Sequence, residues 1–502
     1  MDSATKTKKY IKSKLNSNII KGTLILSAAS ILTRIIGFIY KIYLADILGE
    51  KLLGTYQLIF PIYALCFTIY GAGMQSAISQ VVATLIGKSD TISNKDKFDT
   101  KNNSKRITNI DTKNDPYSIL LTGTVISFII ATSLSVIINL NSTWIANNIL
   151  MVPDRDIYLK LLTYLFPFCS ISACVCGFQY GLENAKPPAI AGIIEQFTRI
   201  SFVFIVQSFF SDKEICCQIA VYGLTVGEFF GFLYNIYSLK YRKKILSKKN
   251  KDNLSTKTYT IDSSLSKETI QKSIFTKKKT STKSQKTTSF CESLKILFPI
   301  FISLTSIKLT ISLLHSAESI FIPAALVKYG YNMDEALSVY GIYSGMAMPF
   351  ILFPTTITTA ISIMLLPAVS KAHSAENKKQ IKKLIKRTSY FCLLTGMTAT
   401  LFFLLFGNTC AKLFFHNELA GKYLTIMSFL CPFLYLTSTY SSILNGLGKP
   451  HMTFMITIIC TLIKILALIF LVPKYGMIAY IFAALVSEIL LSMILRHYCN
   501  QT

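Results

Sequence analysis

Apolar stretches of about 20 residues or more recur along almost the whole chain, and each is long enough for a helix to cross a lipid bilayer. Of the 502 residues, 51% are hydrophobic and only 15% are charged, whereas soluble domains carry about 25% charged residues. This pattern excludes an ordinary soluble enzyme and a nucleic-acid-binding protein, although the net charge is +27. We therefore predict an all-α polytopic membrane protein whose excess positive charge lies between the spans.

The apolar stretches predict twelve membrane spans. We place them at residues 19–44, 53–86, 117–140, 156–181, 188–211, 215–240, 292–326, 336–368, 388–407, 420–446, 450–472 and 476–498. The first stretch is too long for the apolar core of a signal peptide and ends without a small-residue cleavage site, so we expect a retained helix. The basic segment 1–18 precedes it.

The distribution of Lys and Arg predicts the orientation of the chain in the cell membrane. The segments on the side of the N-terminus hold 37 Lys and Arg, and the opposite loops hold 7. Positive residues concentrate in cytoplasmic loops, so both termini are predicted to be cytoplasmic. Segment 241–290 alone contributes 14 of these residues. Its polar composition predicts a disordered or loosely helical linker that can attract anionic lipid headgroups.

The linker divides the chain into two six-span halves, residues 19–240 and 291–498. Short sequence matches occupy equivalent places in the two halves: Lys186-Pro187 with Lys449-Pro450, and Ala77-Ile78-Ser79 with Ala360-Ile361-Ser362. Because each half has an even number of spans, both halves enter the membrane in the same orientation. The predicted fold is therefore two parallel six-helix lobes around a central cleft.

Ionisable residues inside spans are costly, and they point to function by default. In the first span, Arg34 and Lys41 are two helical turns apart and share a face. The other such residues are Glu195 and Arg199 in the fifth span, Glu228 in the sixth, Lys308, His315 and Glu318 on one face of the seventh, Lys464 in the eleventh and Glu488 in the twelfth. The spacing favours an ion pair within the fifth span, and Lys464 and Glu488 are expected to pair between the last two spans.

The first and seventh spans open the two halves, and both carry cations at mid-depth. We predict that Arg34, Lys41 and Lys308 face the cleft and bind an anion, because a guanidinium suits phosphate through forked hydrogen bonds. The remaining polar residues are candidates for coupling-ion or cavity groups: Glu195, Arg199, Glu228, His315 and Glu318.

Three motifs carry a resemblance to a known family: Thr33-Arg34-x-x-Gly37-Phe38, then Gly54-x-Tyr56-Gln57, and SILNGLGKP at residues 442–450. They resemble the SpoVB-type polysaccharide biosynthesis proteins. That family belongs to the multidrug/oligosaccharidyl-lipid/polysaccharide exporter superfamily, together with the MurJ lipid II flippases. In MurJ proteins, cationic residues of the first helix face a central cavity and are thought to hold the lipid diphosphate. The resemblance gives this role to Arg34 and, less directly, to Lys41.

The resemblance also bears on the number of spans. MurJ proteins have fourteen, so it allows fourteen where the apolar pattern predicts about twelve. It further implies a flippase that translocates a polyprenyl-diphosphate-linked saccharide by alternating access, for peptidoglycan, for the spore cortex in sporulation or for another polymer. The alternative is a cation-coupled multidrug exporter of the same superfamily, which would use Glu195, Glu228 or Glu318.

We expect no enzyme and no catalytic residues, because the chain has neither a phosphate-binding G-x-x-x-x-G-K-[ST] loop nor a large acidic extramembrane loop. No cofactor is expected beyond coupling to H+, Na+ or the membrane potential. Most of the twelve cysteines lie in apolar stretches and are expected to pack as small hydrophobic residues without a metal site. The expected partners are the lipid-linked saccharide and membrane lipids, with the protein acting as a monomer.

Overall fold

The computed structural model describes residues 2–95, 116–259 and 290–501, and within these ranges all regular structure is helical. The prediction of an all-α fold is confirmed. The elements are α1 (Asp2–Phe67), η1 (Thr68–Ala72), α2 (Gly73–Lys95), α3 (Pro116–Leu140), α4 (Ser142–Trp144), η2 (Ile145–Ile149), α5 (Asp156–Thr163), α6 (Phe166–Gly181), α7 (Lys186–Gln207), α8 (Lys213–Tyr259), α10 (Phe290–Tyr329), α11 (Met333–Gly341), η3 (Ile342–Ala347), α12 (Met348–Leu352), α13 (Thr355–Ser374), α14 (Lys378–Phe415), α15 (Glu418–Met427), η4 (Ser428–Leu430), α16 (Cys431–Gly446), α17 (Pro450–Tyr475) and α18 (Met477–Asn500).

Within the described ranges, nine helices are long and apolar enough to cross a membrane, and ten if the bent pair α5 and α6 counts as one span. Two features account for the difference from twelve. One of the nine, Ala28–Ile86, contains most of the first predicted span and all of the second. The eighth predicted span, 336–368, is divided among α11, η3, α12 and α13. The structure is therefore compatible with twelve crossings.

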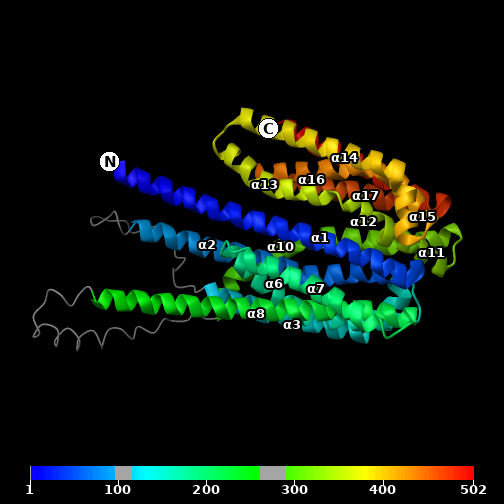
Figure 1. Ribbon diagram of the computed structural model, residues 1–502, viewed down its shortest axis with the longest axis horizontal. Coiled ribbons are helices and arrows are strands. Elements are labelled where there is room, and N and C mark those ends of the chain that lie inside the picture. Colours follow the sequence, from blue (N-terminus) through cyan, green and yellow to red (C-terminus); the bar gives the residue numbers. More distant parts are fainter. Residues whose placement is uncertain (1, 96–115, 260–289, 502) are drawn as a thin grey trace, which may run out of the picture.

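The chain turns back on itself inside α1 at Gly49. The backbone there has φ 69° and ψ 179°, so two helices meet at a sharp kink. A positive φ is available to glycine at little cost because glycine has no Cβ. In Figure 1, α1 runs from the N-terminus to the opposite end of the molecule, and the chain then returns toward α2. Gly49 thus separates the first two predicted spans.

Two helical lobes lie side by side, with α1 between them (Figure 1). The N-lobe contains α2, α3, α6, α7 and α8, and the C-lobe contains α13, α14, α16, α17 and α18; within each lobe these helices contact one another. The first helix of the second half, α10, contacts α2 and α3 of the N-lobe as well as α17 of the C-lobe. The predicted two-lobe architecture is confirmed.

The buried apolar residues show how the lobes are joined. We call the end with the starts of α1 and α10 the near end, and the end with Gly49 and Asn332 the far end. At the far end one large apolar core contains residues of both lobes, including Leu53, Val221, Leu337 and Met427. At the near end, α13, α14, α16, α17 and α18 have a core of their own, and the N-lobe core takes in Leu297 and Phe301 of α10. The lobes therefore share one core at the far end, whereas at the near end their cores are distinct and α10 packs against the N-lobe.

The outer surface of both lobes is strongly apolar. Leu121, Leu405 and Phe470 are each about two-thirds exposed, and a soluble protein rarely leaves so much apolar surface in contact with water. This surface suits contact with lipid hydrocarbon.

Parts of the predicted cytoplasmic segments lie outside the described residues. Of the linker predicted at 241–290, residues up to Tyr259 continue α8 as a helix, and 260–289 lie outside the description. The N-terminal segment is helical from Asp2 onward.

Candidate substrate cavity

A cavity of about 730 Å³ lies between the two lobes. Its N-lobe side is formed by residues of α1 and α7, and its C-lobe side by residues of α12, α13, α16 and α18. The polar residues on its wall are Arg34, Tyr40, Lys41, Tyr56, Gln57, Gln196, Arg199, Thr355, Thr356, Thr359, Thr437, Ser438 and Glu488. In the part of the chain that the structure describes, the charged residues of the wall are thus three cations and one carboxylate.

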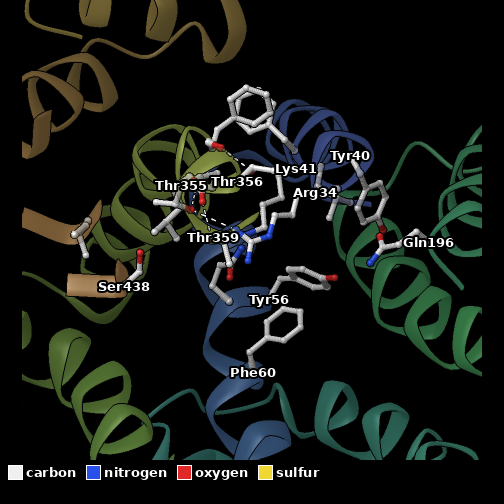
Figure 2. Close-up of a pocket in the computed structure, with 18 of the residues that line it drawn as sticks. Arg34, Tyr40, Lys41, Tyr56, Phe60, Gln196, Thr355, Thr356, Thr359 and Ser438 are labelled. Carbon is white, nitrogen blue, oxygen red and sulfur yellow. Dashed lines mark hydrogen bonds between the residues drawn. The ribbon is translucent and has the colours of Figure 1, made fainter. Parts of the chain in front are cut away.

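Arg34 and Lys41 line the cavity together, as their spacing on one helical face predicts. Figure 2 shows both side chains reaching into the space beside Thr359. Arg34 Nη1 donates hydrogen bonds of 3.3 Å to the hydroxyls of Thr355 and Thr359 on α13. Lys41 makes no hydrogen bond or ion pair within the described ranges. A ligand anion can therefore bind Lys41 directly, and it can bind Arg34 by replacing two long hydrogen bonds.

Arg199 contributes a third cation from the N-lobe. Its guanidinium lies 5.6 Å from the ring centroid of Tyr40 and donates to Gln196 Oε1, and its buried Nε has no partner in the described protein. The expected ion pair of Arg199 with Glu195 is not among the salt bridges of the described chain. The guanidinium is directed toward the cavity wall instead.

Glycines bring Glu195 and Arg199 against α8. Gly223, Gly227 and Gly231 follow one another at four-residue intervals, and a Cβ added at Gly227 would lie 2.7 Å from the backbone oxygen of Glu195. Small residues at this spacing allow membrane helices to approach closely. Glu228 follows Gly227 on α8 and is half-buried. Glu195, Arg199 and Glu228 therefore lie at one helix crossing inside the N-lobe.

Lys308 is not part of the cavity wall. Its Nζ donates to the backbone oxygen of Ala72 at 2.7 Å and to the Ser76 hydroxyl on α2. A Cβ added at the neighbouring Gly73 would lie 1.9 Å from Thr305 Oγ1, so α10 and α2 are in close contact here. The structure therefore places Lys308 in a helix-packing position between the lobes.

The contacts of Arg34 and Lys308 are related by the internal repeat. Thr355 and Thr359 follow Ala72 and Ser76 by 283 residues, the same offset that relates Ala77 to Ala360. The first helix of each half thus places a cation against two positions in the second predicted span of the other half, and these positions are equivalent in the repeat. The two contacts differ in access, because Arg34 is exposed in the cavity and Lys308 is half-buried.

Charged residues of α10 and α17 form a separate cluster, which Tyr480 of α18 joins through a hydrogen bond. Lys464 Nζ lies 2.7 Å from Glu318 Oε1, His315 Nδ1 lies 3.4 Å from Glu318 Oε2, and the Tyr480 hydroxyl donates to Glu318. The expected pairing of Lys464 with Glu488 is therefore wrong: Lys464 binds Glu318, which is almost fully buried. Glu488 instead lines the cavity and accepts a hydrogen bond from Thr437.

Among the described residues, no group of three or more His, Cys, Asp or Glu side chains is placed to hold a metal ion. Sequence reasoning did not single out the cavity threonines Thr355, Thr356 and Thr359. The internal repeat could have pointed to two of them. The offset of 283 residues that relates Ala77 to Ala360 also relates Ala72 to Thr355 and Ser76 to Thr359.

Polar contacts and backbone packing close the cavity at the far end. Asp334 lies 2.6 Å from Lys51 and 3.6 Å from Arg155, and Asn417 donates to Glu50. Beside these contacts, a Cβ on Gly54 would lie 2.0 Å from the backbone oxygen of Leu337. We call the contacts of Asp334 with Lys51 and Arg155 the far-end latch, since they join the two halves of the chain.

Replacing Asp334 with alanine is expected to open the far end in a larger fraction of molecules. Partly exposed ion pairs contribute about 0.2–1 kcal/mol each, so the loss of two corresponds to an increase of a few-fold. The measurement is the rate at which a membrane-impermeant maleimide, added at the far-end side, labels a cysteine at Gln57 of the cavity wall. The matched control is Glu418→Ala, which breaks an exposed ion pair with Lys412 inside the C-lobe. Equal labelling rates in both variants would contradict the latch.

Comparisons with known proteins agree with this architecture. The family model described as "Polysaccharide biosynthesis protein" matches residues 19–373, and the MatE model matches residues 313–469. Stage V sporulation protein B of Bacillus subtilis is 23% identical over 95% of this chain and 82% of that protein. Lipid II flippase MurJ of Bacillus subtilis is 20% identical over 90% of this chain and 77% of that protein.

A solved structure has the same fold. An inward-facing multidrug resistance MATE family transporter of the MOP superfamily superposes with a TM-score of 0.66 at 12% identity, over 95% of this chain and 98% of that one. The chain is homologous to SpoVB and MurJ and is a multi-pass membrane protein. Because the first family model covers more than half of its length, the chain belongs to the polysaccharide biosynthesis protein family.

Proposed function

We propose that the protein is a flippase that moves a polyprenyl-diphosphate-linked saccharide across the cell membrane by alternating access. The observation that carries this proposal is the cavity between the lobes, whose wall has three cations and one carboxylate. A diphosphate has several acceptor oxygens and two or more negative charges, so it matches Arg34, Lys41 and Arg199. The name of one relative, lipid II flippase MurJ, supports the same substrate class.

The direction of transport follows from two features. The excess of Lys and Arg on the near-end segments favours a cytoplasmic near end. In the described residues, the two lobes share one large core at the far end, whereas their near-end cores are distinct and α10 packs with the N-lobe. The structure thus corresponds to an inward-open state in our proposal. The diphosphate enters from the cytoplasmic side, binds Arg34 and Lys41, and is released outward after the far end opens.

Arg34 provides a physical link between binding and closure. It already bridges α1 to Thr355 and Thr359 of the C-lobe. A diphosphate that binds the guanidinium at this place contacts both lobes at once, because the threonines remain beside it. Lys308, which packs against α2, has a positioning role in this proposal and is not a ligand of the diphosphate.

We further propose that no cofactor takes part and that the protein acts as a monomer. The acidic pair Glu195 and Glu228, beside Arg199, is the candidate for coupling to H+ or Na+. His315 and Glu318 are committed to the ion-pair cluster of α10 and α17 and stabilise helix packing.

The experiment that tests the proposal is reconstitution of the full chain into liposomes that contain a fluorescent lipid-linked saccharide. Translocation is measured as the loss of the fraction that is protected from a membrane-impermeant quencher. We expect this fraction to disappear with the protein and to persist in empty liposomes. The competing class, a multidrug exporter of organic cations, predicts ethidium transport in the same liposomes with the lipid fraction still protected, and that result would exclude the flippase.

A further inference from the structure

The charged residues of the cavity are divided between its two walls. The N-lobe wall carries all three cations, Arg34, Lys41 and Arg199, which can only donate hydrogen bonds. The C-lobe wall carries threonine and serine hydroxyls and the single carboxylate of Glu488. In the proposed substrate, the diphosphate has only acceptors, whereas a saccharide has many donors. The two walls therefore suit different parts of one molecule.

The hydroxyls of the C-lobe wall use their protons within the protein. Thr355 donates to the backbone oxygen of Leu352, and Thr359 donates to that of Thr355. Ser438 donates to the backbone oxygen of Tyr435. A hydroxyl has one proton and two lone pairs, so each of these oxygens is left as an acceptor. Figure 2 shows Thr355, Thr359 and Ser438 on the side of the cavity opposite Tyr40 and Gln196.

Glu488 extends this acceptor surface with a charge. Thr437 Oγ1 donates to Glu488 Oε2 at 3.4 Å, and Oε1 has no hydrogen-bond donor within the described chain. A carboxylate repels phosphate, but it accepts short, charge-assisted hydrogen bonds from O–H and N–H groups. Its position on the cavity wall therefore disfavours the diphosphate there and favours a group with donors.

We propose that the C-lobe wall around Glu488 is a saccharide subsite, which selects ligands by the hydroxyl and amide N–H donors of the sugar next to the diphosphate. The inference rests on the proposed function, because it assumes that the N-lobe cations hold the diphosphate. Glu488, Thr437 and Ser438 are then specificity-determining residues, and Arg34 and Lys41 supply affinity without reading the sugar.

The test compares two lipids that differ only in the sugar: a polyprenyl diphosphate with a linked disaccharide and the same polyprenyl diphosphate without it. Binding to the detergent-solubilised full chain is measured by ligand-induced thermal stabilisation over a concentration series. The wild type is expected to prefer the disaccharide lipid by about tenfold, the factor that one hydrogen bond to a charged group supplies. Glu488→Leu is expected to abolish this preference while binding of the bare diphosphate is retained or improved.

Two further variants identify which group of the subsite recognises the sugar, and a third variant is the control. Glu488→Gln keeps one acceptor oxygen and is expected to retain part of the preference, whereas Thr437→Val tests the neighbouring hydroxyl. Glu418→Gln removes an acidic charge outside the cavity and is expected to change neither affinity. Unchanged bare-diphosphate binding in Glu488→Leu shows that the variant is folded.

The outcomes separate this inference from the proposed function. A preference for the sugar that survives Glu488→Leu would overturn the subsite, as would equal binding of both lipids by the wild type. Failure of the wild type to bind either lipid would instead overturn the proposed function.

Discussion

Replacing Arg34 with alanine is expected to lower the translocation rate of the lipid-linked saccharide by about tenfold to a hundredfold, measured with the quencher assay in liposomes. A hydrogen bond to a charged group contributes about 1.5–3 kcal/mol, and this range corresponds to that loss of affinity. Arg34 is exposed in the cavity, and within the described residues its side chain makes two long hydrogen bonds, to Thr355 and Thr359. Its guanidinium can therefore bind phosphate without breaking a strong contact.

Two variants identify what Arg34 contributes. Arg34→Lys keeps the charge but loses the forked geometry, so it is expected to recover only part of the rate. Lys412→Ala removes a cation that pairs with Glu418 outside the cavity, and it is expected to leave the rate unchanged. A folded Arg34→Ala protein with the wild-type rate would show that this guanidinium does not bind the substrate.

Replacing Glu318 with leucine is expected to produce the largest loss of stability. Glu318 and Lys464 have side chains that are 7% and 14% exposed, so the change leaves an almost buried ammonium without its counter-ion. Removing one partner of a buried ion pair costs about 3–5 kcal/mol. The measurement is the midpoint of thermal unfolding in detergent, followed by size-exclusion chromatography of the heated protein.

The double variant Glu318→Leu with Lys464→Leu is the control for this expectation. It removes both charges and is expected to recover most of the lost stability, because apolar replacement of a whole buried pair is often neutral. A midpoint unchanged in the single variant would show that the pair does not hold α10 to α17. A double variant as unstable as the single one would attribute the loss to packing rather than to charge.

The fold was largely predictable because membrane spans leave a strong signal in hydropathy. The apolar stretches and the short repeated motifs led to the two parallel lobes. The internal breaks were less visible: the eighth predicted span is interrupted by η3 and by a turn before Thr355. No charged residue or long polar segment marks that division. The turn before Thr355 falls at Pro354, and proline interrupts helices, but it is also tolerated inside membrane helices.

The cavity was only partly predictable from the sequence. Arg34 and Lys41 stand out because cations are rare inside apolar spans, and both line the cavity. Lys308 is also a cation inside an apolar span, but it packs against α2. This could not be predicted, because the sequence does not reveal that α10 contacts the opposite lobe at its near end. Lys464 binds Glu318 instead of Glu488 for a similar reason: three helices meet there, and spacing along one chain does not select between two carboxylates.

The shared core at the far end also determines what a substrate has to supply. In the alternative conformation, apolar side chains such as Leu53 and Leu337 must separate. Without a ligand, the protein therefore favours the conformation in which the far end is closed. A ligand shifts such an equilibrium only by the difference between its affinities for the two conformations. Reversing a 99:1 preference takes about 5.5 kcal/mol of differential affinity. A lipid that binds tightly but equally in both conformations would therefore occupy the cavity and block it, rather than be carried.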